Sequence, residues 1–190
     1  MQAKMIVTPA LDNGPLSLTG AQTDMLVLAR FEDGGAANMQ AFDELTNGRL
    51  SKLLAQRKFT GRKNQRFTYQ HTGLQRRLIV IGLGRGAEFD CLTIARAVGI
   101  AVHKAVKHQC AKLSFQFLPS RFTSGIKLAT QAQMIHEAAA LKLQEYEGDG
   151  VLTIELLCRK GADKRELTKG LELPLTGRIC CHHVDGHKAS

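Results

Sequence analysis

Tryptophan is absent from this chain of 190 residues, aromatic residues make up only 5% of it, and proline occurs four times. A core therefore has to be built mainly from leucine, isoleucine, valine and alanine. No apolar run approaches the roughly 18 residues that a membrane-spanning helix needs, and no apolar segment of signal-peptide type precedes Pro9. We therefore expect an unexported, cytoplasmic protein that has no membrane partner.

Regularly spaced cysteines are missing as well. The five cysteines are odd in number, and none lies in a C-x-x-C pair. This pattern indicates reduced thiols rather than a disulfide framework. The tail residues His182, His183 and His187, beside Cys180 and Cys181, match no closed zinc pattern. We predict no metal site and no cofactor in this chain.

Acidic residues are missing from one long stretch. Residues 49–77 hold nine basic side chains and no acidic one, an excess as large as the +9 net charge of the whole chain. Such a patch attracts phosphates or an acidic protein surface. Two interpretations stay open: a solvated face, which an acidic neighbouring domain can also cover, or a surface that binds nucleic acid. The candidate contacts with a phosphate or a nucleic acid are Arg57, Lys58, Arg62, Lys63 and Arg66.

Recognisable catalytic motifs are also missing. The chain contains no G-x-S-x-G, no H-E-x-x-H and no evident carboxylate pair in a loop between a strand and a helix. The residues themselves therefore indicate no catalytic site.

The apolar pattern predicts strands that alternate with helices. The strands are expected at 5–7, 24–31, 65–71, 78–83, 112–118 and 151–157, and the helices at 38–54 with a break at 47–48, 91–108, 131–146 and 163–170. Residues 65–83 are expected to form an antiparallel hairpin. This alternation implies an α/β sandwich with a mixed sheet. We expect one domain over residues 1–172 and an irregular tail over residues 173–190.

The buried strand Leu78-Ile-Val-Ile81 leads into the closely spaced glycines Gly82, Gly84 and Gly86. These glycines can be aligned to the G-x-G-x-x-G/A fingerprint, in which glycines let a pyrophosphate approach the backbone. That fingerprint also requires an acidic residue about 20 positions later, and the next strand ends in Phe-Leu-Pro-Ser120 without one. We therefore interpret the three glycines as the tight exit of a central strand, with contact to a phosphate as the alternative.

Three short segments in a fixed order carry a resemblance to a known family. They are Lys58-Phe-Thr-Gly-Arg-Lys63, His71-Thr-Gly73 and Arg77-Leu-Ile-Val-Ile-Gly-Leu-Gly84, followed by a helix that begins near Cys91 and contains Arg96. This combination resembles the N-terminal domain of the leucyl aminopeptidase family, peptidase M17 or cytosol aminopeptidase. The similarity continues through Glu137-Ala-Ala-Ala-Leu141 and Tyr146, and it covers roughly residues 5–171.

The resemblance implies a three-layer α/β/α sandwich with a mixed central sheet, similar to macro domains. In the family this domain is joined to a larger metallopeptidase domain, which holds two divalent metals and all of their ligands. No catalytic or metal-binding residue of the family can therefore be placed on this chain, and the chain alone is expected not to be an enzyme. The resemblance implies a non-catalytic accessory domain that acts in assembly or partner binding.

The resemblance also implies particular partners. They are a peptidase catalytic domain, further copies of the chain in a homo-oligomer, and DNA, which some bacterial members of the family bind. DNA binding would use the basic segment 49–77. The macro-like fold adds an ADP-ribose-like ligand, with a phosphate at the loop from Gly82 to Gly86.

Overall fold

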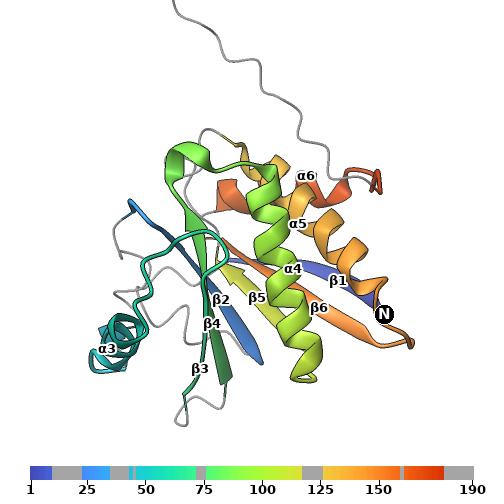
Figure 1. Ribbon diagram of the computed structural model, residues 1–190. Coiled ribbons are helices and arrows are strands. Elements are labelled where there is room, and N and C mark those ends of the chain that lie inside the picture. The colour runs from blue at the N-terminus through green and yellow to red at the C-terminus, as the bar shows by residue number, and fades with distance from the viewer. Residues whose placement is uncertain are drawn as a thin grey trace, which may run out of the picture.

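The computed structural model describes residues 1–9, 23–34, 43–44, 46–71, 76–116, 126–158 and 161–177 (Figure 1). Within these ranges the chain forms one six-stranded sheet of order β1-β6-β5-β2-β4-β3. Neighbouring strands are parallel except β3 and β4, which are antiparallel. The strands are β1 (Gln2–Pro9), β2 (Met25–Phe31), β3 (Arg66–His71), β4 (Arg76–Gly84), β5 (Lys112–Gln116) and β6 (Val151–Cys158). The predicted mixed sheet and the hairpin over residues 65–83 are confirmed.

The first strand differs from its prediction. A strand limited to residues 5–7 was expected, but β1 runs over eight residues and pairs with β6 along its whole length, from Gln2 beside Val151 to Pro9 beside Cys158. Only alternate residues of β1 pack against the core, so the apolar run is shorter than the strand. The strand was predicted in the right place but too short, because pairing with β6, rather than local composition, sets its length.

The helices of the described ranges lie close to where the apolar spacing predicts them. They are α3 (Arg49–Gln56), α4 (Cys91–Lys107), α5 (Leu128–Leu143) and α6 (Gly161–Glu172), with a short 3-10 turn, η1 (Gly86–Glu88), after β4. Asn47 and Gly48 have positive φ angles of 51° and 74°, which confirms the break before α3. Residues 38–42, where the predicted helix begins, lie outside the described residues.

The start of α4 is fixed by its own sequence. The carboxylate of Asp90 accepts hydrogen bonds from the backbone N–H of Thr93 at 2.7 Å and from its hydroxyl at 2.6 Å. This is the arrangement by which an aspartate N-cap satisfies a free N–H group of the first turn. Partial burial opposes ionisation, but these hydrogen bonds outweigh it and hold the pKa of Asp90 below its usual value.

Helices cover both faces of the sheet, in three layers. Figure 1 places α3 on one side and α4, α5 and α6 on the other. The side chains of β2 alternate accordingly, because Met25 and Val27 belong to the core under α4 and α5, whereas Leu26 and Leu28 pack with Leu50 and other residues beneath α3. The predicted α/β/α sandwich is confirmed.

One buried carboxylate lies on the α3 side of the sheet. Glu155 of β6 is only 3% exposed and lies on the same face of the sheet as Leu157, which packs beneath α3. Its oxygens accept hydrogen bonds from the hydroxyls of Thr8 and Ser114 at 2.7 and 2.5 Å, and Lys112 Nζ lies 2.9 Å away. Side chains of three adjacent strands, β1, β6 and β5, are thereby tied together.

Candidate functional site

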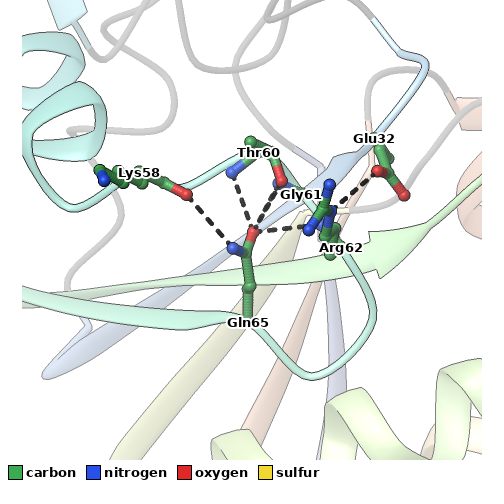
Figure 2. Close-up of polar contacts among 6 residues, drawn as sticks. All are labelled: Glu32, Lys58, Thr60, Gly61, Arg62 and Gln65. Atoms are coloured by element: carbon green, nitrogen blue, oxygen red, sulfur yellow. Dashed lines mark hydrogen bonds and ion pairs between the residues drawn. The ribbon is translucent and has the colours of Figure 1, made fainter.

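The loop between α3 and β3, residues 58–65, is organised around a single amide side chain. Gln65 Oε1 accepts hydrogen bonds from the backbone N–H groups of Thr60, Gly61 and Arg62 at 2.9, 2.9 and 3.1 Å. Gln65 Nε2 donates to the carbonyl of Lys58 at 3.3 Å, which closes the loop (Figure 2). The loop therefore has a fixed shape, and its inward N–H groups are occupied by the protein itself.

The backbone of this loop packs directly on Gly82 near the carboxyl end of β4. The N–H of Gly82 donates to the carbonyl of Gln65, and the N–H of Gly84 donates to the carbonyl of Gly61, both at 2.8 Å. A Cβ atom on Gly82 would lie 2.1 Å from the carbonyl oxygen of Arg62, and one on Gly61 would lie 2.7 Å from the carbonyl oxygen of Phe31. We call loop 58–65 together with Gly82 and Gly84 the glycine corner.

The third glycine of the predicted phosphate loop binds a carboxylate of the chain itself. Gly86 N–H donates to Asp33 at 2.9 Å to one carboxylate oxygen and 3.2 Å to the other. The N–H groups of Gly82, Gly84 and Gly86 thus all donate to protein acceptors. A phosphate at Gly86 has to compete with Asp33, and phosphate contact at these glycines stays a prediction.

The five basic residues predicted from the sequence do not share one surface. Arg62 pairs with Glu32, with Nε 3.1 Å from the carboxylate, and Lys63 pairs with Glu88 at 3.5 Å. Arg66 lies on β3 directly beside Ile81, which faces the α4 side of the sheet, whereas α3 covers the opposite side. The ion-pair partners come from distant segments, so the sequence alone does not identify them.

Unpaired positive charge gathers on α3 instead. Leu50 and Leu54 bury one side of this helix against the sheet. The helix and the two residues directly after it carry exposed cations that form no ion pair within the described residues, and we call them the α3 basic face: Arg49, Lys52, Arg57 and Lys58. Two of the predicted contacts, Arg57 and Lys58, belong to it, together with two residues that the prediction left out.

A small apolar cavity lies on the other side of the sheet, and sequence reasoning missed it. It has a volume of about 60 Å³ and lies between β2, β4, β5 and the helices α4 and α5. Val27, Phe89, Phe115 and Ile135 are among the residues that line it, with Gln131 as a polar side chain whose Nε2 donates to the carbonyl of Ile126 at 2.9 Å.

The described ranges hold neither a metal-binding cluster nor a membrane-spanning helix. No group of three or more histidine, cysteine, aspartate or glutamate side chains able to hold a metal occurs in the described ranges, and Cys91, Cys110 and Cys158 are buried. No helix there is long and apolar enough to span a bilayer. The cysteine and histidine tail at 180–187 lies outside the described residues.

Gln65 provides a direct test of how the glycine corner is held. We expect Gln65→Ala to lower the free energy of unfolding by about 1 kcal/mol, because three N–H groups lose their acceptor and water replaces it only in part. Gln65→Glu retains an acceptor and should lie nearer the wild type. Urea denaturation measures the stability of both variants, and Gln56→Ala, at an exposed position of α3, is the control. Equal stability of Gln65→Ala and the control would contradict this role.

Comparison with known proteins identifies the family. The model of the N-terminal domain of the cytosol aminopeptidase family matches residues 27–150. A probable cytosol aminopeptidase of Trichormus variabilis is 31% identical over 144 residues, and one of Cupriavidus pinatubonensis is 27% identical over 150 residues. These alignments cover 70% and 74% of this chain but only 29% of each relative. The chain thus matches less than a third of the length of these relatives.

Solved structures agree with the fold. A mutant of tomato leucine aminopeptidase matches 90% of this chain with a TM-score of 0.68 and 17% identity, over 36% of its own length. A Trypanosoma brucei macrodomain in complex with ADP matches 90% of this chain and 69% of its own, with a TM-score of 0.61 and 15% identity. The macro-like architecture is confirmed. The chain belongs to the cytosol aminopeptidase family, and the matched part is that family's N-terminal domain.

Proposed function

We propose that this chain is a non-catalytic accessory domain that acts by binding a partner with an acidic surface through the α3 basic face. The observation that carries the proposal is the set of exposed cations without an ion pair in the described part of the chain, at Arg49, Lys52, Arg57 and Lys58, which lie on and directly after a helix that contains no acidic residue. Arg62 and Lys63, in contrast, are neutralised by Glu32 and Glu88.

The α3 basic face is suited to binding because it is both fixed and accessible. Leu50 is fully buried and Leu54 is 2% exposed, so the helix cannot turn its cations away from solvent without breaking its packing. Exposed cations lose little hydration when they meet an acidic surface at the rim of an interface, and they speed association. Binding of this kind weakens as salt is added.

An aminopeptidase catalytic domain is the first candidate for the acidic partner, and the family relation supports it. The aminopeptidase activity named for the relatives is then a property of a larger assembly. We expect the purified chain to release no leucine from a leucyl substrate in the presence of Mn²⁺ or Zn²⁺. Hydrolysis that copurifies with the chain and persists after removal of contaminating peptidases would refute this proposal.

Duplex DNA is the second candidate for the acidic partner. The α3 basic face favours it, since Arg49 and Lys52 are neighbours on one side of α3 and Arg57 and Lys58 follow directly after the helix. Fluorescence anisotropy with a labelled duplex of mixed sequence and with labelled polyglutamate separates the two classes. Binding of both indicates a general acidic partner, and preference for the duplex indicates nucleic acid.

Four phosphate contacts predict a slope of about −3.6 for the logarithm of the binding constant against that of the salt concentration. Failure to bind either probe at low salt would exclude the α3 basic face as a binding surface.

An ADP-ribose-like ligand remains the other alternative. Its support is the likeness of the fold to a macrodomain solved with ADP and the apolar cavity beside Phe89 near the carboxyl ends of β2 and β4. Because Asp33 occupies the N–H of Gly86, Asp33→Ala should bind ADP-ribose more tightly than the wild type. Calorimetry that detects no heat with either protein would remove this alternative.

A further inference from the structure

β3 is one of the two edge strands of the sheet, and β1 is the other. β3 pairs with β4 on one side, and within the described residues it has no other strand neighbour. An edge strand exposes a row of unpaired N–H and C=O groups, which is a template for another strand. We propose that two copies of this chain pair antiparallel through β3, so that the sheet continues from one copy into the other.

The hydrogen-bond pattern determines which residues of β3 face outward. Gly82 N–H donates to the carbonyl of Gln65, so the pair Gln65 and Gly82 is a hydrogen-bonded one. Such pairs alternate along an antiparallel ladder, so Phe67 and Tyr69 also direct their backbone groups toward β4. The N–H and C=O groups of Arg66, Thr68 and Gln70 therefore point to the free edge. The side chains of these three residues are all exposed.

These three outward residues favour one register. With a two-fold axis at Thr68, Thr68 faces Thr68 of the second copy, and Arg66 faces Gln70 of the second copy. All three outward residues then exchange backbone hydrogen bonds with β3 of the second copy. Registers displaced along the strand either bring the two Arg66 side chains closer together or leave an outward residue without a counterpart in β3.

The same register pairs aromatic side chains. Phe67 faces Tyr69 of the second copy in a pair that is not hydrogen-bonded, where opposite side chains approach most closely. Both residues are only half-buried at present and pack against the core beneath α3. A second β3 would cover the part of each ring that is still exposed. The outward backbone groups, the pairing of aromatic rings and the separation of the two Arg66 side chains thus all favour the register with the two-fold axis at Thr68.

Salt distinguishes this inference from the proposed function, on which it does not rest. Each copy carries a net charge of +9, so association of two copies should strengthen as salt screens their repulsion. Binding of an acidic partner to the α3 basic face should weaken under the same conditions. The two proposals can therefore fail independently.

Sedimentation equilibrium of the full chain tests the pairing through Gln70. Gln70→Glu places a carboxylate opposite each Arg66 and should raise the dimer association constant about fivefold, whereas Gln70→Arg should lower it about as much. Gln56→Glu and Gln56→Arg on α3 are matched controls, because they make the same changes of charge at a position away from β3. They should leave the association constant nearly unchanged. A chain that stays monomeric at every concentration, or a dimer that responds equally to the Gln56 and Gln70 variants, would overturn the proposal.

Cross-linking tests the register itself. In a background with Cys180→Ser and Cys181→Ser, Thr68→Cys places two thiols directly opposite, with Cα atoms about 5.5 Å apart, within the range that a disulfide spans. Gln70→Cys should not cross-link, because the two copies of residue 70 are then about 14 Å apart along the strands. Cross-linking of Gln70→Cys as readily as Thr68→Cys would contradict this register.

Discussion

Replacement of Gly82 by alanine is expected to lower the free energy of unfolding by about 3 kcal/mol. The added Cβ would lie 2.1 Å from the carbonyl oxygen of Arg62 and 2.7 Å from the carbonyl carbon of Gly61, so backbone has to move. The loop cannot retreat easily, because Gln65 and Gly84 hold it by hydrogen bonds. Loss of close packing in the glycine corner is therefore the expected consequence, measured by urea denaturation monitored by circular dichroism.

Gly99→Ala is the matched control for this substitution. Gly99 lies within α4, and a Cβ atom added there would meet no heavy atom within 4 Å. Alanine favours a helix over glycine by about 1 kcal/mol, so this variant should be more stable than the wild type. If Gly82→Ala and Gly99→Ala shifted stability in the same direction, the packing described for the glycine corner would be wrong.

Glu155→Ala is expected to have a comparably large effect, about 3 kcal/mol. The carboxylate is 3% exposed, and its removal leaves the Thr8 and Ser114 hydroxyls without their acceptor and Lys112 without its counter-charge. Lys112 keeps 27% of its side chain exposed, so part of the lost charge interaction is recovered by water. Thermal and urea unfolding measure the effect, with Glu147→Ala at an exposed position as the control.

The same residue predicts a dependence of stability on pH. Burial raises the pKa of Glu155, but hydrogen bonds from Ser114, Lys112 and Thr8 outweigh burial and hold the pKa below its ordinary value of 4.5. Because the pKa in the folded state is lower than in the unfolded state, Glu155 contributes stability above pH 4.5, and this contribution is lost as the pH falls through the folded pKa. Glu155→Gln should flatten the acid limb of the stability curve. An unchanged acid limb would show that Glu155 is not a source of the loss.

The helices and most strands could be predicted because their own side chains determine them. Alternation in β3 and helical spacing in α4 follow from local sequence. The ends of β1 could not be predicted, because they depend on pairing with β6, a strand more than a hundred residues away. Long-range pairing leaves little trace in the local composition of an eight-residue strand.

The candidate site was predictable only in part. The glycines Gly82 and Gly84 could be interpreted as a tight strand exit from their spacing, and the contacts of loop 58–65 give the physical reason. The neutralisation of Arg62 and Lys63 could not be predicted, since Glu32 and Glu88 approach them only in the folded chain. Gln65 carried no signal at all, because a single glutamine in a polar loop looks like any other.

The buried carboxylate did leave a signal. Glu155 is the only charged residue within the apolar strand Val151-Leu-Thr-Ile-Glu-Leu-Leu157, and a charge in a buried strand requires partners. Its partners, Thr8 and Ser114, lie on strands that are adjacent to β6 only in the folded sheet. The sequence thus shows that a buried polar network exists but not which residues complete it.

The most direct test of the central claim, that the α3 basic face binds an acidic partner, compares two charge-matched variants. One carries Lys52→Gln and Arg57→Gln in the α3 basic face, and the other carries Arg62→Gln and Lys63→Gln in the glycine corner. Anisotropy titrations with the labelled duplex and with polyglutamate measure affinity across a series of salt concentrations. We expect the α3 variant to bind more weakly and its salt slope with the duplex to shrink by about 2, because two phosphate contacts are lost. The corner variant should change far less, since its cations already have partners. Equal losses in the two variants, or a larger loss in the corner variant, would contradict the account.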